Sequence, residues 1–149
     1  MGNVIWFLRH GDAEDGEPDF ERRLTGKGER QARAAGAALA ALGVEFEACL
    51  TSPKVRARDT ARLACEQLGL EVTDEERLSG GDFDPRELAV GLDEVLLVGH
   101  EPDFSNAIND LTAGRVDMKK GGIAAVDDGA LRLLIRPKET KLIATVTGR

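Results

Sequence analysis

Histidine and cysteine are both rare in this chain of 149 residues, which has two of each and no long run of apolar residues. Two cysteines, Cys49 and Cys65, are too few for a disulfide framework, and we expect both to be small buried apolar residues. No apolar run approaches the roughly 20 residues of a membrane-spanning helix. The length and the 42% content of hydrophobic residues instead predict a single domain over residues 1–149, folded around one core.

Basic residues are also outnumbered by acidic ones. The chain has 20 Lys and Arg residues and 27 Asp and Glu residues, which gives a net charge of −7. An acidic chain is a poor match for nucleic acid or for an anionic lipid surface. The apolar run Val4–Leu8 is too short for a signal peptide and has no basic leader. We therefore expect a cytoplasmic protein without nucleic acid or membrane partners. The sequence has no heptad pattern that would indicate an oligomer, so we expect a monomer.

Short apolar runs are the clearest structural signal in the chain. Their lengths and flanking residues are typical of buried strands, although periodicity alone does not separate them from pieces of buried helix. The runs are Val4–Leu8, Ala48–Thr51, Val95–Val98, Ile123–Val126 and Leu131–Ile135, with a weaker sixth at Leu70–Thr73.

Helical patterns lie between these runs, with apolar residues at three- and four-residue steps. The first covers Gly28–Leu42. The second has Ser52 as its expected N-cap and Pro53 at its first position, and it closes at Gly69. The third follows Pro102. Strands that alternate with helices predict a three-layer α/β/α sandwich around a mostly parallel sheet of about six strands.

Two further segments complete the predicted architecture. The last two strands are joined by Asp127-Asp128-Gly129, which predicts an antiparallel hairpin at one side of the sheet. The segment Asp74–Gly91 is rich in Gly and Asp, and we expect it to be a loop with one helical turn.

Residues suited to chemistry follow directly after three of the predicted strands. Arg9-His10-Gly11 follows the first, Ser52 and a helix carrying Arg56 follow the second, and Gly99-His100 follows the run Val95–Val98. Ligands of open α/β sheets bind beyond the carboxyl ends of the strands, so we expect Arg9, His10, Arg56 and His100 to converge there. Two guanidinium groups and two imidazoles form an anion site that suits a phosphoryl group.

A metal centre is the rival interpretation of two histidines among carboxylates such as Asp12, Glu14, Glu101 and Asp103. The sequence has no HxH, HExxH or CxxC spacing, and adjacent arginines oppose a divalent cation. We therefore expect neither a metal nor another cofactor.

Four ordered blocks of sequence carry a resemblance to a known family. They are Leu8–Glu14 (LRHGDAE), Arg23–Gly28 (RLTGKG), Thr51–Ala61 (TSPKVRARDTA) and Val98–Pro102 (VGHEP), with a looser echo in Lys120–Ile123. With these blocks the chain resembles the histidine phosphatase superfamily, and within it the SixA-type phosphohistidine phosphatases. The resemblance implies the phosphoglycerate mutase-like fold and phosphoryl transfer through a covalent phosphohistidine.

The resemblance also implies a role for each of the four candidate residues. His10 matches the nucleophile, and Arg9, Arg56 and His100 match the positions that hold the phosphoryl oxygens. An imidazole is substantially neutral at pH 7 and can attack without a strong base. The other three groups supply positive charge and hydrogen-bond donors where phosphoryl-transfer catalysis needs them.

The chain departs from the family pattern at the acid that protonates a leaving alcohol. Around Arg77–Gly81, where relatives carry this acid, the sequence has Ser and Gly. The possible substitutes are Glu14, Asp82, Asp84 and Glu101. When a phosphohistidine is cleaved, its leaving group is neutral imidazole. This leaving group depends less on such an acid than an alkoxide does.

The leading hypothesis is therefore a metal-independent phosphatase whose partner is a protein carrying phosphohistidine. One alternative is a phosphomonoesterase acting on small phosphate esters, which needs an acid among the four carboxylates. A further alternative is an inactive module that binds phosphate without turnover.

Overall fold

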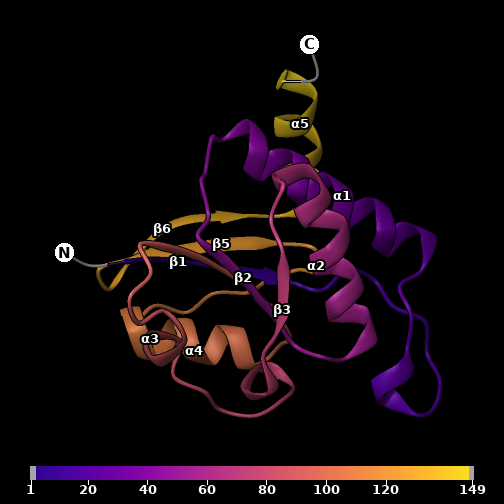
Figure 1. The fold of residues 1–149 in the computed structure, drawn as a ribbon, viewed down its shortest axis with the longest axis horizontal. Coiled ribbons are helices and arrows are strands. Elements are labelled where there is room, and N and C mark those ends of the chain that lie inside the picture. The colour runs from indigo at the N-terminus through magenta and orange to yellow at the C-terminus, as the bar shows by residue number, and fades with distance from the viewer. Residues whose placement is uncertain (1–2, 148–149) are drawn as a thin grey trace.

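The computed structural model describes residues 3–147, in which strands and helices alternate as predicted (Figure 1). The strands are β1 (Val4–Arg9), β2 (Ala48–Thr51), β3 (Val72–Asp74), β4 (Glu94–Gly99), β5 (Ile123–Asp127) and β6 (Ala130–Ile135). The helices are α1 (Gly26–Ala41), α2 (Val55–Leu68), α3 (Pro85–Leu88), α4 (Asp103–Thr112) and α5 (Pro137–Thr147), with short 3₁₀ turns η1 (Asp19–Glu21) and η2 (Glu76–Leu78).

All six strands belong to one sheet, in the order β3-β2-β4-β1-β5-β6. The four strands from β3 to β1 are mutually parallel, while β5 runs antiparallel to β1 and β6 antiparallel to β5. Asp128 and Gly129 have φ angles of 50° and 75°, which the tight turn between β5 and β6 requires. The predicted mostly parallel sheet with an antiparallel C-terminal hairpin is therefore confirmed.

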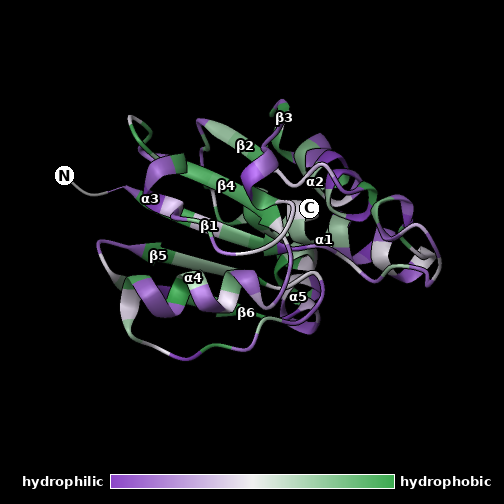
Figure 2. Cartoon of the chain, turned by 90° about the horizontal axis from the view of Figure 1, so that it is seen from below, coloured by the Kyte–Doolittle hydropathy of each residue, from purple (hydrophilic) through white to green (hydrophobic). Residues whose placement is uncertain are grey.

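Two hydrophobic clusters, one on each face of the sheet, make the fold a three-layer sandwich. Along β1, Ile5 and Phe7 join the cluster beneath α3 and α4, while Trp6 and Leu8 join the cluster beneath α1 and α2. Phe7 packs edge-on against Phe104 of α4, with ring centroids 5.2 Å apart. Figure 2 shows the apolar strands enclosed between helices whose colouring alternates between polar and apolar. The predicted α/β/α layering is therefore confirmed.

The cluster on the α1 and α2 face also contains both cysteines. Cys49 and Cys65 are free thiols and are buried, as predicted. Helices α1 and α2 approach closely at Gly36, where a Cβ atom would lie 2.3 Å from the carbonyl oxygen of Ala64.

Several predicted boundaries were wrong. Helix α2 begins at Val55 with Lys54 as its N-cap, and the Ser52 hydroxyl, which lies before the helix, contacts both the Lys54 amide and a histidine. Helix α1 begins two residues early, with Thr25 accepting a hydrogen bond from the Gly28 amide at 3.0 Å. Strand β3 begins at Val72, after the left-handed Gly69.

Two helical segments were missed. The segment from residue 74 to 91 contains η2 and α3, not one helical turn. Helix α5 packs against α1 and was not predicted at all (Figure 1). Within residues 3–147, no helix is both long and apolar enough to cross a membrane.

Candidate active site

Strands β1, β4 and β2 end side by side, and their register brings the predicted residues together. Arg9 pairs with Gly99, and the His10 amide donates a hydrogen bond to the Gly99 carbonyl at 3.0 Å. The Ser52 amide donates to the carbonyl of Val98 at 2.9 Å. The segments after the three strands therefore meet at one edge of the sheet, as the sequence predicts.

His10 is buried, with 8% of its surface exposed, and its ring is fixed by its neighbour. Its Nδ1 lies 2.7 Å from the carbonyl oxygen of Gly11, and since a carbonyl only accepts, the proton sits on Nδ1. This leaves the lone pair on Nε2. Burial lowers the pKa of His10 to about 4, with further lowering by the charges of Arg56, Arg9 and Lys120 and an opposing effect of the Gly11 hydrogen bond. His10 is therefore neutral at pH 7.

His100 lies beside His10, with ring centroids 5.2 Å apart. Its Nε2 lies 2.7 Å from the Ser52 hydroxyl, and its Nδ1 is buried without a partner among residues 3–147. Burial lowers the pKa of His100 to about 3, and the adjacent His10, Arg56 and Lys54 lower it further.

Each of the two arginines is anchored to the protein through one or both of its terminal Nη nitrogens. Arg56 is buried and donates from Nη1 to the carbonyl of Asp19 at 2.9 Å and from Nη2 to its carboxylate at 3.2 Å. Arg9 donates from Nη1 to the carbonyl of Met118 at 2.9 Å. In both arginines Nε is buried and has no partner within the described chain.

Three buried nitrogen atoms at this edge thus lack a partner among residues 3–147: Nε of Arg9, Nε of Arg56 and Nδ1 of His100. An unpaired buried polar group costs on the order of 1–3 kcal/mol, so such groups are normally satisfied by water or a ligand. Two cationic arginines beside neutral imidazoles form a site that attracts an anion with several oxygens.

The backbone beneath His10 is held by a close approach of two glycines. A Cβ atom on Gly11 would lie 2.5 Å from the carbonyl oxygen of Gly28, in the first turn of α1. Gly11 therefore lets the loop after β1 lie directly against α1. The Gly11 amide also donates to the Thr60 hydroxyl at 3.0 Å, which donates to the carbonyl of Arg56 at 2.7 Å.

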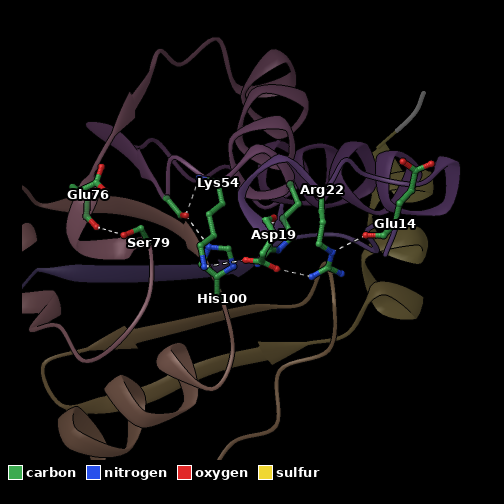
Figure 3. A network of polar contacts seen from close by, with 9 residues as sticks. Glu14, Asp19, Arg22, Lys54, Glu76, Ser79 and His100 are labelled. Atoms are coloured by element: carbon green, nitrogen blue, oxygen red, sulfur yellow. Dashed lines mark hydrogen bonds and ion pairs between the residues drawn. The ribbon is translucent and has the colours of Figure 1, made fainter. Parts of the chain in front are cut away.

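Asp19 and Lys54 are parts of this site that the sequence did not single out. The Asp19 carboxylate lies 3.4 Å from Nζ of Lys54 and 3.1 Å from Nη1 of Arg22 (Figure 3). Hydrogen bonds from Arg22, Arg56 and Lys54 lower the pKa of Asp19 to about 2. Lys54 stands inside the third family block and could have been found there, whereas Asp19 lies between blocks and carries no sequence signal.

The four carboxylates named as possible acids lie in different surroundings. Asp84 accepts a backbone N–H in the first turn of α3 at 3.0 Å, and Glu101 accepts one in α4 at 2.7 Å. These two therefore have structural partners. Glu14 and Asp82 are exposed.

Asp103, at the start of α4, is a further carboxyl group near this edge that the sequence placed only among possible metal ligands. Partial burial raises its pKa, and the nearby carboxylates of Asp82 and Glu101 raise it further, against a hydrogen bond from the Gly81 backbone. A raised pKa is the property that a proton donor needs.

Comparison with known proteins decides the family. The model of the histidine phosphatase superfamily (branch 1) matches residues 5–100, which include all four predicted site residues. The chain belongs to the histidine phosphatase superfamily.

Similar proteins within this superfamily differ in activity. The chain is 35% identical over 144 residues to an uncharacterized protein of Picosynechococcus sp., covering 87% of each. It is 33% identical over 91 residues to the 2,3-bisphosphoglycerate-dependent phosphoglycerate mutase of Parvibaculum lavamentivorans, covering 56% of this chain but only 43% of the mutase. Among solved structures, the protein histidine phosphatase SixA in complex with tungstate superposes with a TM-score of 0.80 at 25% identity, over 91% of this chain and 98% of SixA.

Proposed function

We propose that this chain, as a single histidine phosphatase domain, removes the phosphoryl group from a histidine on a partner protein and does so without a metal ion. Membership of the superfamily and likeness to phosphatases support phosphatase activity. The observation that carries the proposal is the pair of buried imidazoles 5.2 Å apart, next to two anchored arginines with unpaired Nε groups.

In the first step, Nε2 of His10 attacks the phosphorus atom. The bond between phosphorus and the substrate imidazole breaks, its electron pair stays on the substrate nitrogen, and the substrate ring, protonated by solvent, leaves as neutral imidazole while the phosphoryl group is bound to His10. In the second step, water attacks the same phosphorus, the electron pair of the bond to His10 returns to Nε2, and inorganic phosphate leaves with the protons of the water. The lowered pKa of His10 keeps its lone pair available at neutral pH, so that no separate base is needed for the first step.

Arg9, Arg56 and His100 stabilise the phosphoryl oxygens during both steps. The Nε groups of the arginines are buried and face no protein acceptor among residues 3–147. The Ser52 hydroxyl accepts the Lys54 amide at 3.2 Å, which favours donation of its own proton to Nε2 of His100. The proton of neutral His100 then sits on Nδ1 and is available to an oxygen. Loss of one such preorganised donor costs on the order of 10²–10³ in rate.

The choice of phosphohistidine as substrate depends on the acid. In the segment 77–81, Ser79 donates its hydroxyl proton to the Glu76 carbonyl at 2.7 Å (Figure 3), and the segment has no carboxylate of its own. A phosphohistidine leaves as imidazole after protonation from solvent, whereas an alkoxide needs a donor held in place. This difference favours the protein phosphohistidine over a small phosphate ester.

The test uses protein treated with EDTA and a peptide carrying phosphohistidine. We expect release of inorganic phosphate at an undiminished rate after metal removal, and a loss of at least about 10³-fold in His10→Ala. A matched control is Lys119→Ala, which removes an exposed side chain. Absence of release, or full activity of His10→Ala, contradicts the proposal.

Two measurements separate the alternatives. Values of kcat/KM for a panel of small phosphate esters, set against phosphohistidine, decide the substrate class, and a large preference for an ester together with its loss in Asp103→Asn indicates a phosphomonoesterase. Mass spectrometry after brief incubation detects acid-labile phosphate on His10. Phosphate binding without such labelling indicates a binding module.

A further inference from the structure

A groove of about 490 Å³ lies between α1 and α5, and its walls are basic. Lys27 and Arg30 line it from α1, and Lys138 and Lys141 line it from α5. All four side chains are exposed. Helix α5 packs against α1 (Figure 1), and this packing places four positive charges around one concave surface.

These four cations differ from most other basic side chains of the protein. None of them forms an ion pair with a carboxylate among residues 3–147, whereas basic residues elsewhere are typically paired, as Arg136 is with Glu139 at 2.9 Å. In a chain with a net charge of −7, the groove is therefore a region whose positive charges are not balanced by ion pairs among residues 3–147. Such a region attracts an anionic partner and speeds its association.

The groove lies next to the candidate active site. Gln31 lines the groove, and its Oε1 accepts the backbone N–H of Asp12 at 2.8 Å, two residues after His10. The Asp12 carboxylate in turn pairs with Lys120 at 3.1 Å. A chain segment that leaves the active site across Asp12 therefore reaches the groove directly.

We propose that this groove binds an acidic segment of the phosphorylated partner protein, close in space to the phosphohistidine. The inference depends on the proposed function, because it assumes that the substrate histidine belongs to a protein. The four cations line the groove from two helices, so they match carboxylates of an inserted segment. The side chain of Leu142, which is 66% exposed at the groove, adds an apolar contact that such a segment can cover.

The test compares phosphohistidine peptides of one length in which the flanking residues are glutamates, glutamines or lysines. We expect the glutamate peptide to have a kcat/KM about tenfold above that of the glutamine peptide at low ionic strength, with the advantage lost at high ionic strength. The lysine peptide is expected to be the poorest substrate. Free phosphohistidine, which does not extend to the groove, is expected to depend less on ionic strength than the glutamate peptide does.

Two double variants test the groove from its two sides. Lys138→Glu with Lys141→Glu changes α5, and Lys27→Glu with Arg30→Glu changes α1. Each is expected to abolish the advantage of the glutamate peptide while leaving the glutamine peptide unchanged. The control is Arg86→Glu. Arg86 is an exposed cation that lines a different pocket, together with Asn3 and Gly129 near the start of β1. This variant is expected to keep the higher kcat/KM for the glutamate peptide.

The outcomes distinguish this inference from the proposed function. Equal hydrolysis of the glutamate and glutamine peptides overturns the groove inference and leaves the function standing. If no phosphohistidine peptide is hydrolysed, the function fails, and fluorescence anisotropy of the unphosphorylated glutamate peptide decides about the groove. Salt-sensitive binding that both double variants lose supports the groove, and binding that they retain overturns it. Binding of phosphatidylserine vesicles instead of the peptide also overturns it.

Discussion

Nη2 of Arg56 lies 3.2 Å from the carboxylate of Asp19, and Nη1 of the same guanidinium donates to the Asp19 carbonyl at 2.9 Å. Nη1 and Nη2 of Arg56 are therefore each held by Asp19, whereas Nε has no partner among residues 3–147 and can donate to a ligand. Asp19 is a positioning residue, since it holds the arginine by two of its nitrogens.

Replacement of Asp19 is expected to separate binding from turnover. Asp19→Ala removes a negative charge from the site, so inorganic phosphate should inhibit at a concentration several-fold lower. The same change leaves Arg56 held only by the backbone carbonyl of residue 19, so kcat should fall about tenfold through lost orientation. Steady-state kinetics with phosphate as inhibitor measures both. Asp15→Ala, which removes an exposed carboxylate from the same loop, is the control, and identical effects of the two changes contradict the positioning role.

Gly28 is expected to be intolerant of any side chain. A Cβ atom there would lie 1.9 Å from the carbonyl oxygen of Asp12, in the loop that follows β1 and His10. Gly28→Ala should therefore lower the free energy of unfolding by roughly 2–4 kcal/mol and reduce kcat. Gly26→Ala is the matched control in the same helical turn, because its Cβ would lie 3.5 Å from the nearest atom, Nη1 of Arg30. Urea denaturation measures the free energy of unfolding of the two variants. Equal values would mean that the loop after β1 shifts to accommodate the added Cβ atom.

The site could be predicted from the sequence only where residues follow strands. Arg9, His10 and His100 directly follow buried apolar runs, so the carboxyl edge of a parallel sheet was enough to group them. Asp19 could not be found in this way, because it lies in a segment without periodicity and acts through a 3₁₀ turn. Ser52 looked like an N-cap, yet its hydroxyl is hydrogen-bonded to His100, a partner 48 residues away.

The fold was predictable to the same extent. Strands buried on both faces appear as continuous apolar runs, and β1, β4 and β5 were found with nearly their true bounds. Helix α5 was missed because its apolar residues are few and β-branched residues recur in it, so local propensity does not indicate a helix. Its contact with α1 stabilises it, and such long-range packing is not visible in a local pattern.

The two histidines are expected to make the protein less stable in mild acid. The pKa of His10 is lowered to about 4 and that of His100 to about 3, while the unfolded chain protonates both near pH 6.5. Between pH 6.5 and 4 the unfolded state therefore binds more protons, and each histidine lowers the free energy of unfolding by about 2 kcal/mol at pH 5. Asp19, whose pKa is lowered to about 2, acts only below about pH 4.

Urea denaturation at pH 7 and pH 5 measures this loss directly. In His10→Gln, the difference in free energy of unfolding between pH 7 and pH 5 should be smaller by the contribution of one histidine. This holds whatever the stability of the variant at pH 7. A loss that is the same size in the variant contradicts the assignment to His10.

Because the chain has only two histidines, their protonation can be followed one residue at a time. We expect the imidazole ¹⁵N signals of His10 and His100 to stay those of neutral rings from pH 8 down to about pH 5, whereas in urea both rings should titrate near pH 6.5. Burial is the main cause, and the charge of Arg56 adds to it, so Arg56→Met should raise the pKa of both imidazoles. Arg62→Met, a change at an exposed arginine further along α2, should leave both pKa values unchanged.

The ¹⁵N signals of His10 should also show that the proton of the neutral ring is on Nδ1, because the Gly11 carbonyl can only accept a hydrogen bond. A neutral ring protonated on Nε2 would contradict the geometry that leaves Nε2 free to attack.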